Sequence, residues 1–263
     1  KEILQRFMEA VSQFERIIND SALIQLRRLN EDEIIGTDNK QGLLENYLTL
    51  SKETDISMQD IALGTEEVRV GNKRLSLHTL SDTDDLPSSV SADVRFEKLS
   101  TDRSDCRLSF ASPVGLLLNC NHIYNQYLFL DNSDENLQKF EKSARNMHSL
   151  ARYSRANQIN KEWIENYLNE AHSFGLSSIR AHFNVMAWSE DPNELKQLKN
   201  DCGSALALME CKPRHNTTDV ATLFWAAMPG NSGDFPSEES FYTFIEPSLC
   251  FFTEETNYHN SPS

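Results

Sequence analysis

Three side chains in the second half of the chain could together ligate a metal ion: Cys202, Cys211 and His215. Thiolates and an imidazole suit Zn²⁺, but structural zinc sites take four ligands and usually contain closely spaced pairs of cysteines. Here the two cysteines are nine positions apart, and no fourth ligand accompanies them. Cys202 also falls within a segment with the pattern of a packed helix. We therefore expect no metal site at these residues.

A second possible cation site is the acidic group Asp82, Asp84 and Asp85. Carboxylate oxygens are ligands for hard cations such as Ca²⁺. The central glycine and the distal glutamate of a calcium-binding loop are missing, however. The group is therefore interpreted as a solvated acidic loop.

Two histidines could act as general bases. His122 begins the polar group that continues with Tyr124, Asn125 and Gln126, and His182 lies in an alternating apolar segment. A histidine within reach of a hydroxyl or a water can take its proton, so a small hydrolase built on His122 or His182 is one hypothesis. The favoured interpretation is that both are packed strand residues with hydrogen-bonded rings.

Basic side chains are concentrated between residues 139 and 161, where they could contact phosphates if they lie on helices. Glu141 interrupts the stretch and Glu162 follows it, and the chain has a net charge of −15. Such a charge repels nucleic acid and anionic membranes at long range. We expect a solvated face and no direct contact with nucleic acid, although a single-stranded nucleic-acid-binding module is a further alternative. The basic residues are Lys139, Lys142, Arg145, Arg152, Arg155 and Lys161.

No familiar catalytic or nucleotide-binding motif occurs in the sequence. Gly-x-x-x-x-Gly-Lys-Ser/Thr, Gly-x-Gly-x-x-Gly, His-Glu-x-x-His, Cys-x-x-Cys and Gly-x-Ser-x-Gly are all absent. We therefore expect no catalytic residue, no cofactor-binding residue and no cofactor. Five widely spaced cysteines favour reduced thiols in a cytoplasmic protein. No run approaches the roughly 18 to 20 apolar residues that span a bilayer.

The hydrophobic periodicity predicts helices and strands in alternation. In the first part it predicts helices at 2–18, 31–35 (capped by Asn30) and 42–50, a short strand at 26–29, a hairpin about Gly71-Asn72, and an acidic loop at 81–105 with a weak strand at 94–99. In the second part it predicts strands at 107–111, 123–130 and 179–188, helices at 133–151 (capped by Ser133), 157–174 and 194–209, an apolar run at 220–228 and a final helix at 238–251.

This order of elements predicts an α+β fold with an antiparallel or mixed sheet and long helices. The strand–helix–strand pattern after residue 106 is typical of a ferredoxin-like split βαβ unit. We expect residues 1–105 to form a helical part with a β-hairpin and the acidic loop. Residues 106–263 would form the βαβ region, and the two parts could be one continuous domain.

Several longer segments resemble the TraG proteins of conjugative transposons, and together they extend over essentially the whole chain. They are residues 120–129 (CNHIYNQYLF), 181–188 (AHFNVMAW), Pro229-Gly230-Asn231 with Asp234-Phe235-Pro236, and 255–258 (ETNY); residues 14–17 (FERI), 26–29 (LRRL) and 110–113 (FASP) agree as well.

That family resembles the energising ATPases of type IV secretion systems, the TrbE/CagE-like group, in which an N-terminal region precedes a RecA-like motor with Walker A and Walker B motifs. The resemblance implies that this chain is a noncatalytic N-terminal fragment that ends before the Walker A loop. No nucleotide-binding residue of the family has a counterpart here. The implied partners are other conjugation and secretion proteins, the C-terminal motor domain and sister copies. The implied location is the cytoplasm, or the periphery of the inner membrane through those partners.

Overall fold

The computed structural model describes residues 1–22, 24–51, 59–64 and 67–253. The chain forms two compact units, Lys1–Gln59 and Asp60–Ser263. This division lies earlier than the expected boundary between residues 105 and 106. The reason is that the strand at 73–80 pairs with the strand at 178–189, so the hairpin assigned to the first part belongs to the sheet of the second.

The first unit is mainly helical, as expected. Its elements are α1 (Glu2–Asp20), α2 (Glu31–Ile35), β1 (Gly36–Thr37), β2 (Lys40–Gln41) and α3 (Leu43–Thr49). Asn30 caps α2 through a reciprocal pair of hydrogen bonds with Glu33. The prediction of a strand at 26–29 is wrong. The Asn19 side chain forms hydrogen bonds with both the N–H and the carbonyl of Leu26, and it therefore takes the place of a strand partner.

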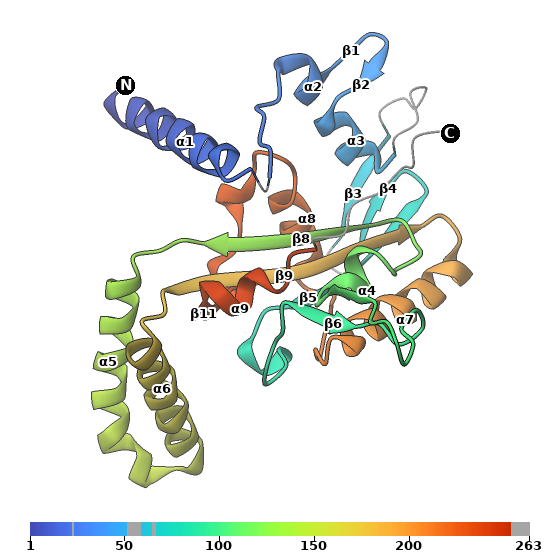
Figure 1. Cartoon of the computed structure of the whole chain (residues 1–263). Coiled ribbons are helices and arrows are strands. Elements are labelled where there is room, and N and C mark those ends of the chain that lie inside the picture. Colours follow the sequence, from blue (N-terminus) through green and yellow to red (C-terminus); the bar gives the residue numbers. More distant parts are fainter. Residues whose placement is uncertain (23, 52–58, 65–66, 254–263) are drawn as a thin grey trace. The chain divides into compact units, whose positions relative to one another are not determined.

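The second unit contains an antiparallel sheet with β9 at its centre (Figure 1). Its strands are β3 (Ile61–Leu63), β4 (Val68–Val70), β5 (Lys73–Leu80), β8 (His122–Phe129), β9 (Ser178–Ser189), β10 (Arg214–Asn216) and β11 (Phe241–Phe244). β8 pairs with β9 along one edge, while β5 and then β11 pair along the other. The predicted hairpin is present as β4 and β5, with Gly71 at φ 56° in its turn.

A split βαβ unit is formed by β9, α7 (Pro192–Leu208) and β10, although the sequence predicted no strand at 214–216. Both β9 and β10 are antiparallel to β5, so they run in the same direction with β5 between them. The α+β fold class is therefore confirmed. The strand that splits the unit comes from residues 73–80, which the sequence did not place in this region.

The final helix expected at 238–251 is largely wrong. The chain forms the strand β11 and then only the short helix α9 (Ile245–Leu249). β9 is longer than β5, whose pairing stops at Phe183, so the edge of residues 178–181 is left open for β11. Backbone pairing with this open edge of β9 thus outweighs the helical pattern of the local sequence. The apolar run before it becomes α8 (Val220–Ala226).

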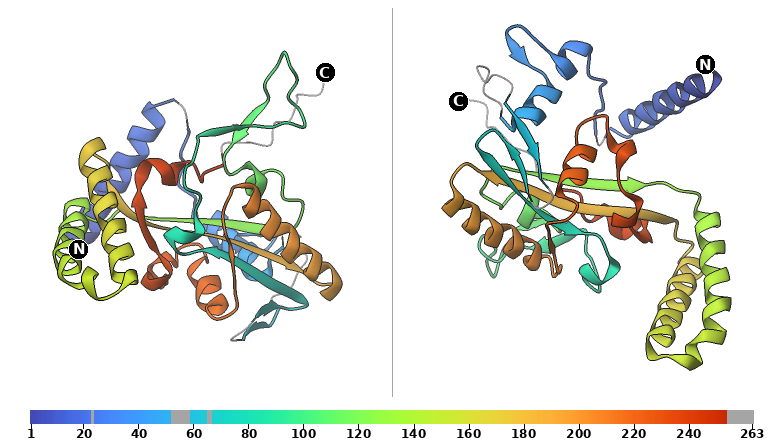
Figure 2. Two further views of the ribbon diagram at one scale, coloured as in Figure 1. Left: turned by 90° about the horizontal axis from the view of Figure 1, so that it is seen from below. Right: turned by 180° about the vertical axis from the view of Figure 1, so that it is seen from behind.

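The two helices predicted between the strands at 123–130 and 179–188 are α5 (Ser133–Leu150) and α6 (Arg155–Phe174). They connect β8 to β9 as a helical hairpin (Figure 2). Asn132 caps α5 in place of the expected Ser133, whose hydroxyl instead accepts a hydrogen bond from the Ser178 N–H. Ser154 caps α6, and Gly175 ends it in the left-handed conformation. The excursion at 81–105 and the residues after it contribute the small hairpin β6 (Asp93–Arg95) and β7 (Arg107–Ser109), followed by α4 (Ser112–Gly115).

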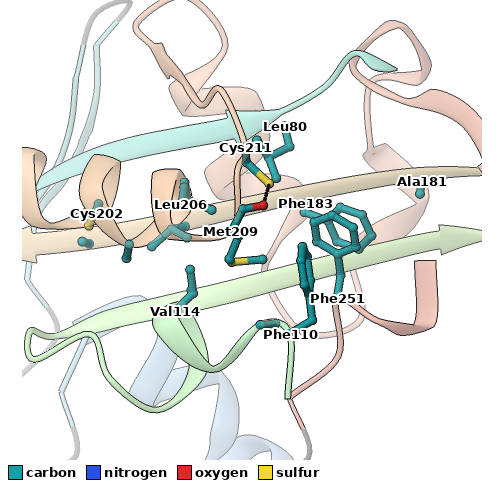
Figure 3. Packing of buried hydrophobic residues seen from close by; sticks show 14 of the residues in the cluster. Leu80, Phe110, Val114, Ala181, Phe183, Cys202, Leu206, Met209, Cys211 and Phe251 are labelled. Carbon is teal, nitrogen blue, oxygen red and sulfur yellow. Dashed lines mark hydrogen bonds between the residues drawn. The ribbon is translucent and has the colours of Figure 1, made fainter. Parts of the chain in front are cut away.

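The main core lies between the sheet and α7 and includes Phe183 of β9 (Figure 3). The Phe183 ring stacks on Phe251 with centroids 4.4 Å apart, and Phe110 meets Phe251 edge-on at 5.3 Å. Alternation along β9 places Ala181, Phe183, Val185 and Ala187 in this core, as the sequence pattern indicates.

Helix α7 offers a matched test of this core. Leu206 is 1% exposed, whereas Leu208 on the same helix is 74% exposed. We expect Leu206→Ala to lower the free energy of unfolding by about 2–5 kcal/mol, because it leaves a cavity. Leu208→Ala should cost under about 0.5 kcal/mol. Urea unfolding followed by circular dichroism measures both, and equal losses would contradict the position of the core.

Candidate functional site

His182 lies on β9 and is fully buried. Its Nδ1 lies 2.6 Å from the Glu239 carbonyl oxygen, and the side-chain amide nitrogen of Asn184 lies 3.0 Å from its Nε2. Because a carbonyl only accepts and an amide N–H only donates, the ring is neutral and carries its proton on Nδ1. Burial lowers the pKa of His182 to about 4. Neither ring nitrogen is left to take a proton from a substrate, so this is the geometry of a packed strand residue.

His122, at the start of β8, has a different environment. Its Nδ1 lies 2.9 Å from the Cys120 carbonyl oxygen and its Nε2 lies 3.1 Å from that of Val114. Only the imidazolium can donate to both carbonyls at once. Burial alone would lower the pKa of His122, but the bonds to Cys120 and Val114 outweigh it and raise the pKa. A cation that donates through both nitrogens cannot act as the general base of a hydrolase.

The other polar residues of this group do not join His122 in one site. The Tyr124 hydroxyl donates to the Phe251 carbonyl at 3.0 Å and packs against the main core. The Asn125 amide donates to the Asn184 side chain at 2.9 Å, on the other face of the sheet. The alternation of side chains along β8 therefore places Asn125 on the opposite face from His122, while Tyr124 shares the face of His122 but is bonded to Phe251.

The sulfur of Cys120 lies 4.0 Å from Nδ1 of His122 and is half-buried. The Cys120 side chain also interacts with that of the buried Cys202 on α7. Sequence reasoning missed this cluster, since 82 positions separate the two cysteines. The short spacing of Cys120 and His122 was the one available signal.

The three residues considered for zinc are not brought together. Cys202 lies in the core cluster against which Cys120 packs, the Cys211 thiol donates to the Met209 carbonyl at 3.6 Å, and the His215 ring lies 5.3 Å from that of His78. Within the part of the chain that the structure describes, no group of three or more His, Cys, Asp or Glu side chains could hold a metal ion.

The acidic loop is only partly solvated. Asp85 is buried and accepts hydrogen bonds from the N–H groups of Ser81 and Asp82 and from Nε of Arg214 at 2.9 Å. Arg214 also lies 3.3 Å from Asp82. The carboxylates of Asp82 and Asp85 therefore connect this loop to β10. The prediction of a fully solvated acidic loop is wrong in this respect.

The basic stretch lies on α5, α6 and the turn between them. Lys161 pairs with Glu165 at 3.2 Å, and the Arg152 guanidinium lies over the Tyr153 ring. The expectation of local ion pairs on an exposed face is therefore supported at Lys161. Over α5 and α6 with their connecting turn, six basic residues are balanced by six acidic ones.

An apolar cavity of about 640 Å³ lies between the β6–β7 hairpin, the segment after α4, and α7. Phe96, Leu108 and Leu117 line it on one side, and Ala205 and Leu208 line it on the other. Asn119 and Asp201, the sequence neighbours of Cys120 and Cys202, also belong to its wall. The cavity can admit a small molecule, but its lining residues do not include Cys120 or Cys202 themselves.

The sequence matches no protein-family model, and it matches no curated protein significantly. The resemblance to TraG proteins therefore stays a prediction, and one of its segments, 255–258, lies outside the described residues. None of the described helices is both long enough and apolar enough to cross a membrane.

The burial of His182 has a pH-dependent consequence. The pKa of an unfolded histidine is about 6.5, whereas that of folded His182 is about 4. Between these values the unfolded chain binds a proton that the folded chain does not, so stability falls as the pH falls. We expect this histidine to contribute up to about 3 kcal/mol of that loss. Burial also lowers the pKa of His78 to about 4, which adds a similar dependence.

Urea unfolding between about pH 7 and pH 4.5 measures this effect. The variant His182→Gln removes the titrating ring and should show a shallower fall in stability with decreasing pH than the wild type. Identical slopes for the two proteins would contradict the neutral, buried state of His182.

Proposed function

We propose that this chain is a noncatalytic docking and assembly part of a conjugative transfer ATPase of the TraG-like, type IV secretion class. The resemblance of its longer segments supports the class. The hydrogen bonds of His122 and His182 support a noncatalytic role, because they occupy the ring nitrogens that a hydrolase would need. On this proposal the chain acts in the cytoplasm or at the periphery of the inner membrane through its partners.

The observation that carries the docking role is the apolar side of α1. Five of its large apolar side chains are at least 56% exposed: Ile3, Leu4, Phe7, Phe14 and Ile17. Contiguous exposed apolar residues of this kind mark interaction surfaces. We call this set, together with Val11 and Ile18, the α1 stripe.

Polar residues on another side of α1 make hydrogen bonds within the first unit. Arg28 binds Glu15 at 2.9 Å and Ser12 at 2.8 Å, and Asn19 bonds the backbone of Leu26. The segment that follows α1 thus lies along its polar residues and does not cover the stripe.

The spacing within the stripe favours a second copy of the chain as the occupant. Leu4, Phe7, Val11, Phe14 and Ile18 follow one another at intervals of three and four residues. This is the a/d pattern by which two helices pack knobs into holes, and it is complementary to itself. We therefore propose that α1 pairs with α1 of a sister subunit.

The substitution Phe14→Glu tests this pairing. It places a carboxylate in the α1 stripe, and we expect it to weaken self-association at least tenfold, or by about 1.4 kcal/mol. Analytical ultracentrifugation of the 263-residue chain over a range of concentrations gives the association constant.

Gln13→Glu is the matched control, because it adds the same charge at the neighbouring, exposed position outside the stripe. It should associate like the wild type. A wild-type chain that stays monomeric at every concentration, or equal weakening by both substitutions, would refute assembly through α1.

Nucleic-acid binding is the alternative that the exposed basic residues of α5 and α6 favour. Under the docking proposal we expect no binding of a labelled single-stranded oligonucleotide, even at low salt, because the chain carries a charge of −15. Fluorescence anisotropy measures this. Binding that declines steeply with salt and is lost in Lys142→Glu/Arg145→Glu would instead support the alternative.

A further inference from the structure

Cys120 and Cys202 come from two elements that the fold holds firmly together. Cys202 lies at one end of the buried cluster shown in Figure 3, on the face of α7 that covers the sheet. Cys120 precedes β8 and packs against the same cluster. The carbonyl of its neighbour Asn121 accepts a hydrogen bond from the Trp188 N–H at 3.2 Å, which continues the pairing of β8 with β9. The two thiols are therefore placed by the core and not by a mobile loop.

The charge of His122 makes the two thiols unequal. The ring donates to two backbone carbonyls and so carries a positive charge, and the Cys120 sulfur lies 4.0 Å from it. An adjacent imidazolium stabilises a thiolate. Cys202 has no exposed surface, so it favours its neutral form, in which its S–H can donate to a neighbouring thiolate.

The electrostatics of the pair agree with this geometry. The hydrogen bond from Cys202 and the interaction with His122 hold the pKa of Cys120 well below that of a free thiol, although burial and the Asp201 carboxylate on α7 oppose them. The pKa of Cys202 is raised, first by its bond to Cys120 and then by burial. Cys120 is thus the nucleophilic member of the pair.

We propose that Cys120 is an oxidation-sensitive thiolate and that Cys202 is its resolving thiol, so that a hydroperoxide converts the pair into a disulfide between the segment before β8 and α7. The nucleophile is half-buried and therefore partly open to a small oxidant, and the resolving thiol is fully buried in the core cluster against which Cys120 packs. This inference does not depend on the proposed docking function.

The chemistry proceeds in two balanced steps. The Cys120 thiolate attacks one oxygen of the hydroperoxide ROOH and the O–O bond breaks, which gives the sulfenic acid Cys120–SOH and an alkoxide RO⁻. The alkoxide takes a proton from water and leaves as ROH. The Cys202 thiol then attacks the sulfenic sulfur, forms the S–S bond and releases water. Overall the two thiols lose two electrons, and the peroxide is reduced to ROH and water.

Cys211 provides an internal comparison. It is buried like Cys202, but its thiol donates to the Met209 carbonyl, and burial raises its pKa to about 12. Cys250 is half-buried like Cys120, and its thiol donates to the Glu246 carbonyl at 3.8 Å. The proposal therefore requires selective oxidation of the Cys120–Cys202 pair.

The first experiment treats the full 263-residue chain with stoichiometric hydrogen peroxide, followed by alkylation in denaturant and nonreducing peptide mapping by mass spectrometry. We expect one major cross-link, between Cys120 and Cys202, with Cys211 and Cys250 still alkylated. Random pairing, or oxidation of Cys250 at the same rate as Cys120, would overturn the proposal.

The second experiment measures the rate at which iodoacetamide alkylates Cys120 in the folded, reduced wild-type chain. Between about pH 6 and pH 7 this rate should change less than about twofold. The rate for N-acetylcysteine rises about tenfold over the same interval, because its thiol is mostly protonated there. A Cys120 rate that rises tenfold as well would refute the thiolate, and this measurement needs no variant.

Two substitutions assign the roles. Cys202→Ala should stop the reaction at the sulfenic acid, which dimedone traps on Cys120, whereas Cys120→Ser should leave Cys202 unoxidised. His122→Gln keeps a hydrogen-bonding side chain without the charge, and its Cys120 alkylation rate should rise with pH more steeply than that of the wild type. A His122→Gln profile identical to the wild type would exclude His122 from this role.

Discussion

Backbone hydrogen bonding along both edges of β9 holds the second unit together. The strand has twelve residues, and an interior strand of that length must have partners for its N–H and carbonyl groups on each side. β8 supplies one side, while β5 and β11 share the other. These three partners come from residues 73–80, 122–129 and 241–244, so one strand brings together segments from most of the unit.

The same strand separates an apolar environment from a polar one. Ala181, Phe183 and Val185 lie in the main core beneath α7. His182 and Asn184 point to the opposite face and are equally buried, so each needs a hydrogen-bond partner there. Asn125 of β8 and the Glu239 carbonyl supply those partners. A polar pair is thereby accommodated inside the sheet without a charge.

Two histidines on adjacent strands thus have different protonation states, because their hydrogen-bond partners differ. His182 lies between a carbonyl and an amide N–H and is neutral. His122 lies between two carbonyls and is a cation. The second arrangement also determines the state of Cys120, because a half-buried positive charge next to a thiol favours its ionised form. The chemistry of this fold therefore follows from which backbone groups face each ring.

The sequence by itself determined the elements whose signals are local. The amphipathic pattern of α1, the cap at Asn30 and the helix end at Gly175 all act within about four residues, as helical hydrogen bonds do. The hairpin about Gly71 and the α+β class follow from equally local patterns. Only the tertiary structure decided that β11 replaces a helix, that β5 joins the sheet of β9, and that Cys120 meets Cys202. Each of these depends on contacts between residues far apart in the chain. The partner of a strand edge or of a buried group is determined by which segment packs against it in the folded protein, and no short-range sequence pattern encodes that.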